Sequence, residues 1–319
     1  MHHHHHGGHA HSHDRVDPSI AASAEGVRAV AWSFVILAVT ALLQFVVVAL
    51  SGSVALLADT IHNVGDAATA IPLWVAFVLG RRPPSRRFTY GYGRVEDLAG
   101  LFVLLVILAS AVVAALEAAD RFQHPQAVTG LPWVMLAGLV GFLGNEAVAV
   151  FRIRTGRRIN SVALVADGYH ARADGLTSLA VVGGAVGVWL GLPLADPIVG
   201  LAISAAIVVI AVRSGGAIFT RLLDGVDPGV ADLVHHAAGH VAGIRAVSET
   251  KARWLGHRLH VDVAVSVDRS QPLAGAQAIA DALESELAAH LPALSLATVR
   301  FSHDVPVVQE AVTGAARPD

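Results

Sequence analysis

Residues 51–66 read SGSVALLADTIHNVGD and residues 162–180 read VALVADGYHARADGLTSLA, and these two apolar stretches carry the same polar pattern. Both contain A-D-x-x-H-x-x-x-D, and matched positions lie 108 residues apart, as 170 − 62 = 108 shows for the two histidines. With about 100° of rotation per helical residue, the His and both Asp residues of each copy fall on one narrow helix face. Two helices that present such faces to each other are predicted to form one shared polar site.

Charged side chains are costly inside an apolar helix, so this repeated face requires a compensating partner. An Asp at the bilayer centre costs roughly 2.5–3.5 kcal/mol on insertion scales. Two imidazoles and two carboxylates form a four-ligand set that suits a tetrahedral divalent cation. The first acids of the two copies, Asp59 and Asp167, are expected to orient the histidines or to relay protons, and interhelical hydrogen bonding is the structural alternative for the whole set. The candidate ligands are His62, Asp66, His170 and Asp174.

Zn²⁺ is the metal that this donor set favours. Cd²⁺, Co²⁺, Fe²⁺ and Mn²⁺ are weaker candidates for the same ligands, whereas Mg²⁺ and Ca²⁺ prefer sites made of oxygen alone. The chain has no Cys and only two Met, which argues against a Cu(I) site of thiolates or thioethers. No organic cofactor is expected.

Composition places these helices in a membrane. The chain of 319 residues is 54% hydrophobic and 15% charged, with a mean hydropathy of +0.59, whereas soluble domains contain about 25% charged residues. A net charge of −3 provides no basic field for nucleic acid. A transmembrane helix needs about 20 apolar residues, and we therefore expect an all-α bundle of six transmembrane helices. The six apolar runs are residues 30–50, 54–79, 98–119, 131–151, 162–190 and 198–219.

Arginine residues between these runs predict the orientation, because cytoplasmic loops carry an excess of Lys and Arg. Nine lie between the second and third runs or between the fourth and fifth, against Arg121 alone in the opposite loops. These loops and both termini are therefore expected in the cytoplasm, with the chain multi-pass in the cell (inner) membrane. The nine are Arg81, Arg82, Arg86, Arg87, Arg94, Arg152, Arg154, Arg157 and Arg158.

Charge returns after the sixth run, and the pattern there predicts a small α+β domain. Asp227-Pro228 is a helix start signal, and Val261, Val263 and Val265 alternate with other residues as in a half-buried strand. The expected element order is αββαβ. The chain then divides into a His-rich cytosolic N-terminal tail (1–28), a six-span transport domain (29–219), a cytosolic αββαβ domain (220–307) and a flexible tail (308–319).

Several polar residues other than the motif His and Asp residues also have expected roles. Arg172 lies on the opposite helix face from His170, and Glu146 is its expected partner. Glu96 and Asp97 open the third run and are expected to complement the positive end of the helix dipole. The C-terminal domain holds a candidate second metal site, although the same histidines could simply be solvated. Its candidate ligands are His260, His303 and Asp304 first, and then His257 and His240.

The two motif stretches resemble the cation diffusion facilitator family of metal/proton antiporters. The segments FTYGYGRVEDLAG (88–100), GHRLHVDVAV (256–265) and VRFSHDVP (299–306) are similar to the same family. The resemblance covers about residues 25–307 and implies that the four motif ligands form the transport site. It further implies a metallochaperone-like cytosolic domain, a homodimer formed through that domain, and export of Zn²⁺ against protons.

Two departures from the family pattern bear on further metal sites. Some relatives hold a metal between the second and third spans with acids and histidines, but here residues 81–94 read RRPPSRRFTYGYGR and contain neither. No metal is therefore expected in that loop. Many relatives have a histidine where this chain has Gln277, which weakens the case for the full cytosolic site.

The expected activity is proton-coupled efflux by alternating access. Metal binding requires neutral imidazole and ionised carboxylate, and a reference His pKa of about 6.5 lets protons compete with Zn²⁺ near neutral pH. The expected partners are the lipid bilayer, a divalent metal ion and protons, and not nucleic acid. An intramembrane metal-dependent hydrolase is the alternative, although the sequence has no H-E-x-x-H motif. A metal sensor that moves no ions is the third hypothesis.

Overall fold

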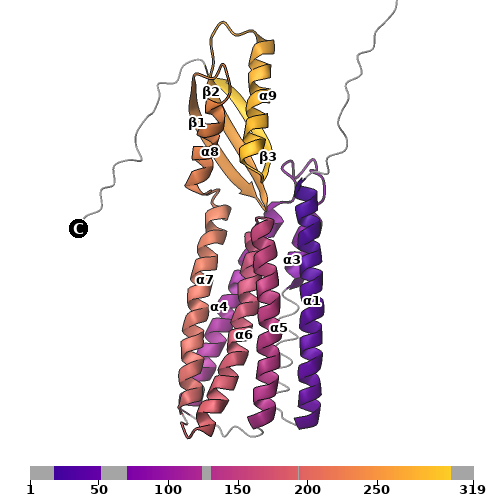
Figure 1. Cartoon of the computed structure of the whole chain (residues 1–319), viewed down its shortest axis with the longest axis vertical. Coiled ribbons are helices and arrows are strands. Elements are labelled where there is room, and N and C mark those ends of the chain that lie inside the picture. Colours follow the sequence, from indigo (N-terminus) through magenta and orange to yellow (C-terminus); the bar gives the residue numbers. More distant parts are fainter. Residues whose placement is uncertain (1–17, 52–69, 124–130, 193, 303–319) are drawn as a thin grey trace, which may run out of the picture.

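The computed structural model describes residues 18–51, 70–123, 131–192 and 194–302. Long helices form a bundle, and a small α+β domain lies at one end of it (Figure 1). Within the described residues α6 is the central helix, because it packs against α4, α5 and α7 and also contacts α3. The helices of the bundle are α1 (Pro18–Ser51), α3 (Ala70–Gly80), α4 (Arg94–Gln123), α5 (Leu131–Arg158), α6 (Val162–Trp189) and α7 (Ala195–Leu222).

Four of the described helices are long and apolar enough to cross a membrane by length and composition, and they lie in α1, α4, α5 and α7. They also expose large apolar side chains on their outer faces, including Trp32, Leu42, Leu116 and Val212. A soluble bundle would bury such residues, whereas lipid accepts them. The helix α6 has the same length as α5 and α7 but carries the polar motif along its buried side.

Close approach of α5 and α6 depends on a small residue within the motif. A side-chain carbon built on Gly168 would lie 2.7 Å from the Cγ1 atom of Ile153 and 3.0 Å from its backbone nitrogen. The first distance is shorter than real side-chain contacts, and the second is a very tight contact with backbone, which moves less easily than a side chain. Small residues allow transmembrane helices to approach closely, so Gly168 fixes how deeply α6 sits against α5.

Two boundaries differ between the sequence-based expectation and the structure. The helix α1 begins at Pro18, so the last part of the segment predicted to be a tail (1–28) is helical. The fourth apolar run ends at residue 151, but α5 continues to Arg158. Arg152 is therefore a helical residue and is 1% exposed, not a loop residue. Arg157 and Arg158 lie in the last turn of α5, where cations complement the helix dipole, and this explains why the helix outlasts the apolar run.

The C-terminal domain confirms the predicted αββαβ order. Its elements are α8 (Pro228–Gly239), β1 (Ala246–Leu255), β2 (Arg258–Ser266), α9 (Leu273–His290) and β3 (Leu294–Ser302). The sheet order is β1-β2-β3, with β2 antiparallel to β1 and parallel to β3. Asp227 caps α8 by accepting a hydrogen bond from the Gly229 backbone N–H at 2.8 Å, as the start signal predicts.

The alternating valines of β2 form the core of this domain. Val261, Val263 and Val265 are almost fully buried, and they pack in one cluster with Val234 of α8 and Leu283 of α9. Both helices therefore cover the same face of the sheet, and their last turns approach each other there.

A buried histidine joins the two domains at the turn between β1 and β2. His257 Nδ1 lies 2.8 Å from Glu96 Oε2 at the start of α4, and His257 Nε2 lies 3.2 Å from Ser23 Oγ of α1. A neutral imidazole with its hydrogen on Nδ1 satisfies both contacts, donating to the carboxylate and accepting from the hydroxyl. Gly256 forms the tight turn with φ of +63°, which places His257 between the helices. We call Ser23, Glu96 and His257 the junction.

Arg221, near the end of α7, reinforces the same interface. Its Nη1 donates to the backbone carbonyl of Asn160 at 2.7 Å and to that of Gly256 at 2.9 Å. Its guanidinium group also stacks over Trp254 of β1, 4.3 Å from the ring centroid. Glu96 and Asp97 do lie in the first turn of α4, as expected, but Glu96 is also a partner of His257.

Replacement of His257 by alanine is expected to loosen the junction. The variant removes the imidazole partner of the buried Glu96 carboxyl, at a cost of about 1–3 kcal/mol. Hydrogen exchange of the full chain in detergent should accelerate at the start of α4 and in the β1–β2 turn. The control His235→Ala changes an exposed histidine of α8 and should leave both segments protected. Unchanged exchange in His257→Ala would contradict a supporting role for the junction.

Candidate metal centre

The described half of the predicted metal site lies on α6. His170 Nδ1 is 3.6 Å from Asp174 Oδ1, one helical turn further along, and the two side chains are 2% and 8% exposed. Ligands about 2.0–2.2 Å from Zn²⁺ at a tetrahedral angle lie about 3.4 Å apart. The two side chains are therefore spaced as neighbouring ligands of one ion. Asp59, His62 and Asp66 lie outside the described residues.

Asp167 forms a buried ion pair with an arginine of α5. Its Oδ2 lies 2.8 Å from Arg152 Nη1, and both side chains are almost completely buried. The pair forms because α5 extends beyond its apolar run and includes Arg152. The apolar run alone assigns Arg152 to a loop and therefore does not predict this pair. Arg152 compensates the charge of Asp167, so Asp167 has a structural partner. The expected role of Asp167 in orienting histidine or relaying protons stays a prediction.

The predicted partner of Arg172 is confirmed. Its Nε donates to Glu146 Oε2 at 3.0 Å, and its Nη2 donates to Glu146 Oε1 at 2.5 Å. The two parallel bonds form a bidentate pair between α6 and α5. Arg172 points to the opposite side of α6 from His170. Glu146 therefore compensates the Arg172 charge away from the helix face that carries His170 and Asp174.

The structure describes three of the five candidate ligands of the C-terminal domain, and these three do not form one group. His257 belongs to the junction, and His303 and Asp304 lie outside the described residues. His260 faces Tyr90, with ring centroids 6.5 Å apart. Burial lowers the pKa of His260 from its usual value, and the neighbouring Arg253 and Arg258 lower that pKa further, so its imidazole is neutral at neutral pH. The favoured set of His260, His303 and Asp304 as a second metal site stays a prediction.

His240 instead lies beside two histidines that were not among the candidate ligands. These are His236, one turn earlier on α8, and His290, at the end of α9. The ring nitrogens of all three histidines lie within 4.8 Å of one another. Among the described residues this is the one group of three such side chains. The i,i+4 spacing of His236 and His240 was visible in the sequence, but the approach of His290 depends on the packing of α8 against α9.

Apolar helices around a buried His–Asp pair, with an α+β domain at one end, define a membrane protein whose polar centre lies between its helices. The transmembrane-domain model of the cation efflux family matches residues 30–222, and the model of the family's cytoplasmic domain matches residues 227–301. The chain belongs to the cation efflux, or cation diffusion facilitator, family of membrane transporters.

Similar proteins occur in several bacteria. A probable cation efflux system protein of Mycobacterium tuberculosis is 53% identical over 292 residues, which cover 91% of this chain and 88% of that protein. The zinc transporter ZitB of Escherichia coli is 28% identical over 80% of this chain and 82% of its own length. The magnetosome protein MamB of a Magnetospira species is 24% identical over 76% of this chain and 83% of its own length.

The Asp167 pair leads to a prediction that separates its structural role from proton relay. Asp167→Asn leaves the buried Arg152 charge uncompensated and should destabilise the protein by roughly 3–5 kcal/mol. Glu25→Gln breaks the more exposed pair of Glu25 with Arg158 and should cost at most about 1 kcal/mol. Thermal unfolding of both variants in detergent at one pH measures the difference. Equal stabilities, combined with an altered pH profile of transport in Asp167→Asn, would support the relay role instead.

Proposed function

We propose that this transporter exports divalent metal ions from the cytosol, Zn²⁺ foremost, in exchange for protons. The proposed site consists of His62, Asp66, His170 and Asp174. The observation that carries the proposal is the buried pair of His170 and Asp174, 3.6 Å apart on the central helix of the bundle. Nothing in the repeated motif requires two such pairs for packing alone, whereas a tetrahedral cation needs four donors.

The surroundings of α6 support a shared site with the other copy of the motif. The helix α3 begins at Ala70, four residues after Asp66, and contacts α6. The charged groups nearest the motif, Arg152 and Arg172, are each held by an acid, Asp167 and Glu146 respectively. Each of these cations is therefore paired with an acid outside the proposed set of metal ligands.

Zn²⁺ is proposed as the main cargo because two imidazoles and two carboxylates suit it, with Cd²⁺, Co²⁺, Fe²⁺ and Mn²⁺ as further cargo. Proton coupling follows from the same ligands. Zn²⁺ binds neutral imidazole and carboxylate, so each proton that arrives from outside competes with the metal. In the proposed cycle Zn²⁺ enters from the cytosol, the bundle opens outward, and protons displace the ion.

The orientation is proposed from the positive charges at one end of the bundle. Arg81, Arg82 and Arg87 lie in the connection between α3 and α4, and Arg157 and Arg158 lie at the end of α5. The C-terminal domain packs at this same end through the junction. By the positive-inside rule both termini are in the cytoplasm, and we place the protein in the inner membrane as a homodimer joined by its C-terminal domains.

Flux in reconstituted vesicles tests the function. An imposed gradient, acidic on the side that receives the metal, should accelerate Zn²⁺ transport by wild type. His170→Ala and Asp174→Ala should each abolish that flux because they remove a ligand, whereas His235→Ala on the surface of α8 should transport normally. Flux that ignores the proton gradient, or that survives Asp174→Ala, would contradict the proposal.

Replacement of His62 by aspartate tests the choice of metal. The change converts the set to one imidazole and three carboxylates, which is a harder set of donors. Carboxylate suits Mn²⁺ better than imidazole does, so the ratio of Zn²⁺ to Mn²⁺ flux should fall. A panel of divalent ions, measured with wild type and His62→Asp at one pH, provides the comparison. An unchanged ratio would show that His62 does not contact the ion.

A further inference from the structure

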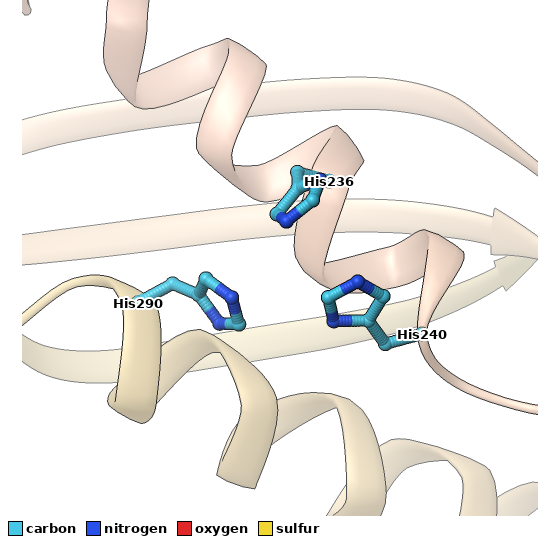
Figure 2. A group of neighbouring side chains, drawn as sticks. All are labelled: His236, His240 and His290. Atoms are coloured by element: carbon cyan, nitrogen blue, oxygen red, sulfur yellow. The ribbon is translucent and has the colours of Figure 1, made fainter.

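Three histidines meet on the surface of the C-terminal domain, where the last turns of α8 and α9 come together. Figure 2 shows His236 and His240 on one helix and His290 on the other, with the three rings turned toward one another. The ring centroids are 4.5 Å apart for His236 and His240, 5.4 Å for His236 and His290, and 5.6 Å for His240 and His290. The three side chains therefore present their ring nitrogens to one small region of the surface.

The hydrogen bonding of His290 fixes which of its nitrogens is available. Its Nδ1 donates to the backbone carbonyl of Glu286 at 2.8 Å, because a carbonyl oxygen can only accept. The lone pair of His290 is then on Nε2. Histidines that bind metals commonly donate their other ring N–H to a backbone carbonyl, which sets both tautomer and ring orientation. His290 is thus prepared as a ligand before any ion arrives.

Glu286 adds a carboxylate to the three imidazoles. Its Oε2 lies 3.5 Å from His240 Nδ1, too long for a good hydrogen bond but close to the 3.4 Å expected between neighbouring ligands of tetrahedral zinc. Two i,i+4 pairs, His236–His240 and Glu286–His290, therefore face each other across the α8–α9 contact. The side chains are partly exposed, so an ion from solvent can reach them and ring rotation can close the remaining gap.

We propose that His236, His240, His290 and Glu286 bind one Zn²⁺ ion, with the three histidines as ligands and the carboxylate of Glu286 as the fourth donor. Imidazole and carboxylate together favour Zn²⁺, Co²⁺ or Ni²⁺ over Mg²⁺ and Ca²⁺. All four side chains belong to one chain, and the ion joins the ends of two helices that cover the same face of the sheet. The bound metal therefore links the last turn of α8 to the last turn of α9, separately from the transmembrane site.

Residue-resolved protection of histidines tests this site in the full chain. The protein in detergent is treated with a histidine-acylating reagent, with and without added Zn²⁺, and modified residues are located by mass spectrometry. Zn²⁺ should protect His236, His240 and His290 together. His235, adjacent on α8 and exposed, is an internal control and should react equally in both samples. Protection of His235 to the same extent, or no protection of the three, would overturn the proposal.

Metal stoichiometry provides the second measurement. The background chain carries His170→Ala and has alanine in place of every histidine of residues 2–13, so that neither the transport motif nor the N-terminal run adds to the count. His240→Ala in this background should lower bound Zn²⁺ by one ion per chain, and His235→Ala should not. Glu286→Gln, which keeps the shape of the side chain, should weaken binding about 10–100-fold. Equal zinc content in His240→Ala and His235→Ala would refute the site.

These experiments do not depend on the proposed transport function. Loss of zinc flux with retained protection of the three histidines would contradict the transport mechanism alone. Retained flux without protection would contradict the α8–α9 site alone. A variant could also lose zinc because its C-terminal domain unfolds. Hydrogen exchange of β2, whose buried valines pack against both helices, detects such unfolding.

Discussion

The packing of α5 against α6 depends on two ion pairs between charged side chains of these helices. Arg152 and Asp167 neutralise each other in the interior, and Arg172 and Glu146 do so across the same pair of helices. An uncompensated charge at these depths would cost several kcal/mol, more than a typical packing contact returns. The two ion pairs join α5 to α6, and they allow α6 to carry a His–Asp face toward the middle of the bundle.

Close packing and charge pairing support each other in this helix pair. Gly168 lies between Asp167 and Tyr169, and its lack of a side chain lets α6 approach the backbone of Ile153. The neighbouring residue in α5 is Arg152, the partner of Asp167. A wider spacing of the helices would separate that ion pair. The ion pair between Arg152 and Asp167 thus requires a glycine at position 168 as well as the two charged residues.

Much of the fold could be predicted from the sequence because its periodicities are local. The alternation around Val263 and the capping signal at Asp227 were sufficient to predict the αββαβ order. The pairing of Arg172 with Glu146 followed from the cost of a single arginine in an apolar run. The half of the candidate site that the structure describes, His170 and Asp174, followed from helical spacing alone.

Features that depend on contacts between distant segments could not be predicted in this way. Arg152 seemed to belong to a loop because an apolar run says where hydrophobic residues stop, not where the helix stops. From the sequence His257 was a candidate metal ligand or a solvated histidine, and only the docking of the two domains buries it against Glu96. His290 is 50 residues from His240, as 290 − 240 = 50, and their proximity depends on how α8 and α9 lie on the sheet.

The position of His257 limits how the bundle can move. The His257 imidazole, in the β1–β2 turn of the C-terminal domain, contacts the Ser23 hydroxyl of α1 and the Glu96 carboxylate at the start of α4. These two helix ends cannot separate while both contacts persist. Any opening of the bundle at this end must therefore either carry the small domain along with one helix or break one of the two contacts. A movement of the C-terminal domain is therefore coupled to the separation of α1 and α4 at the end of the bundle where that domain packs.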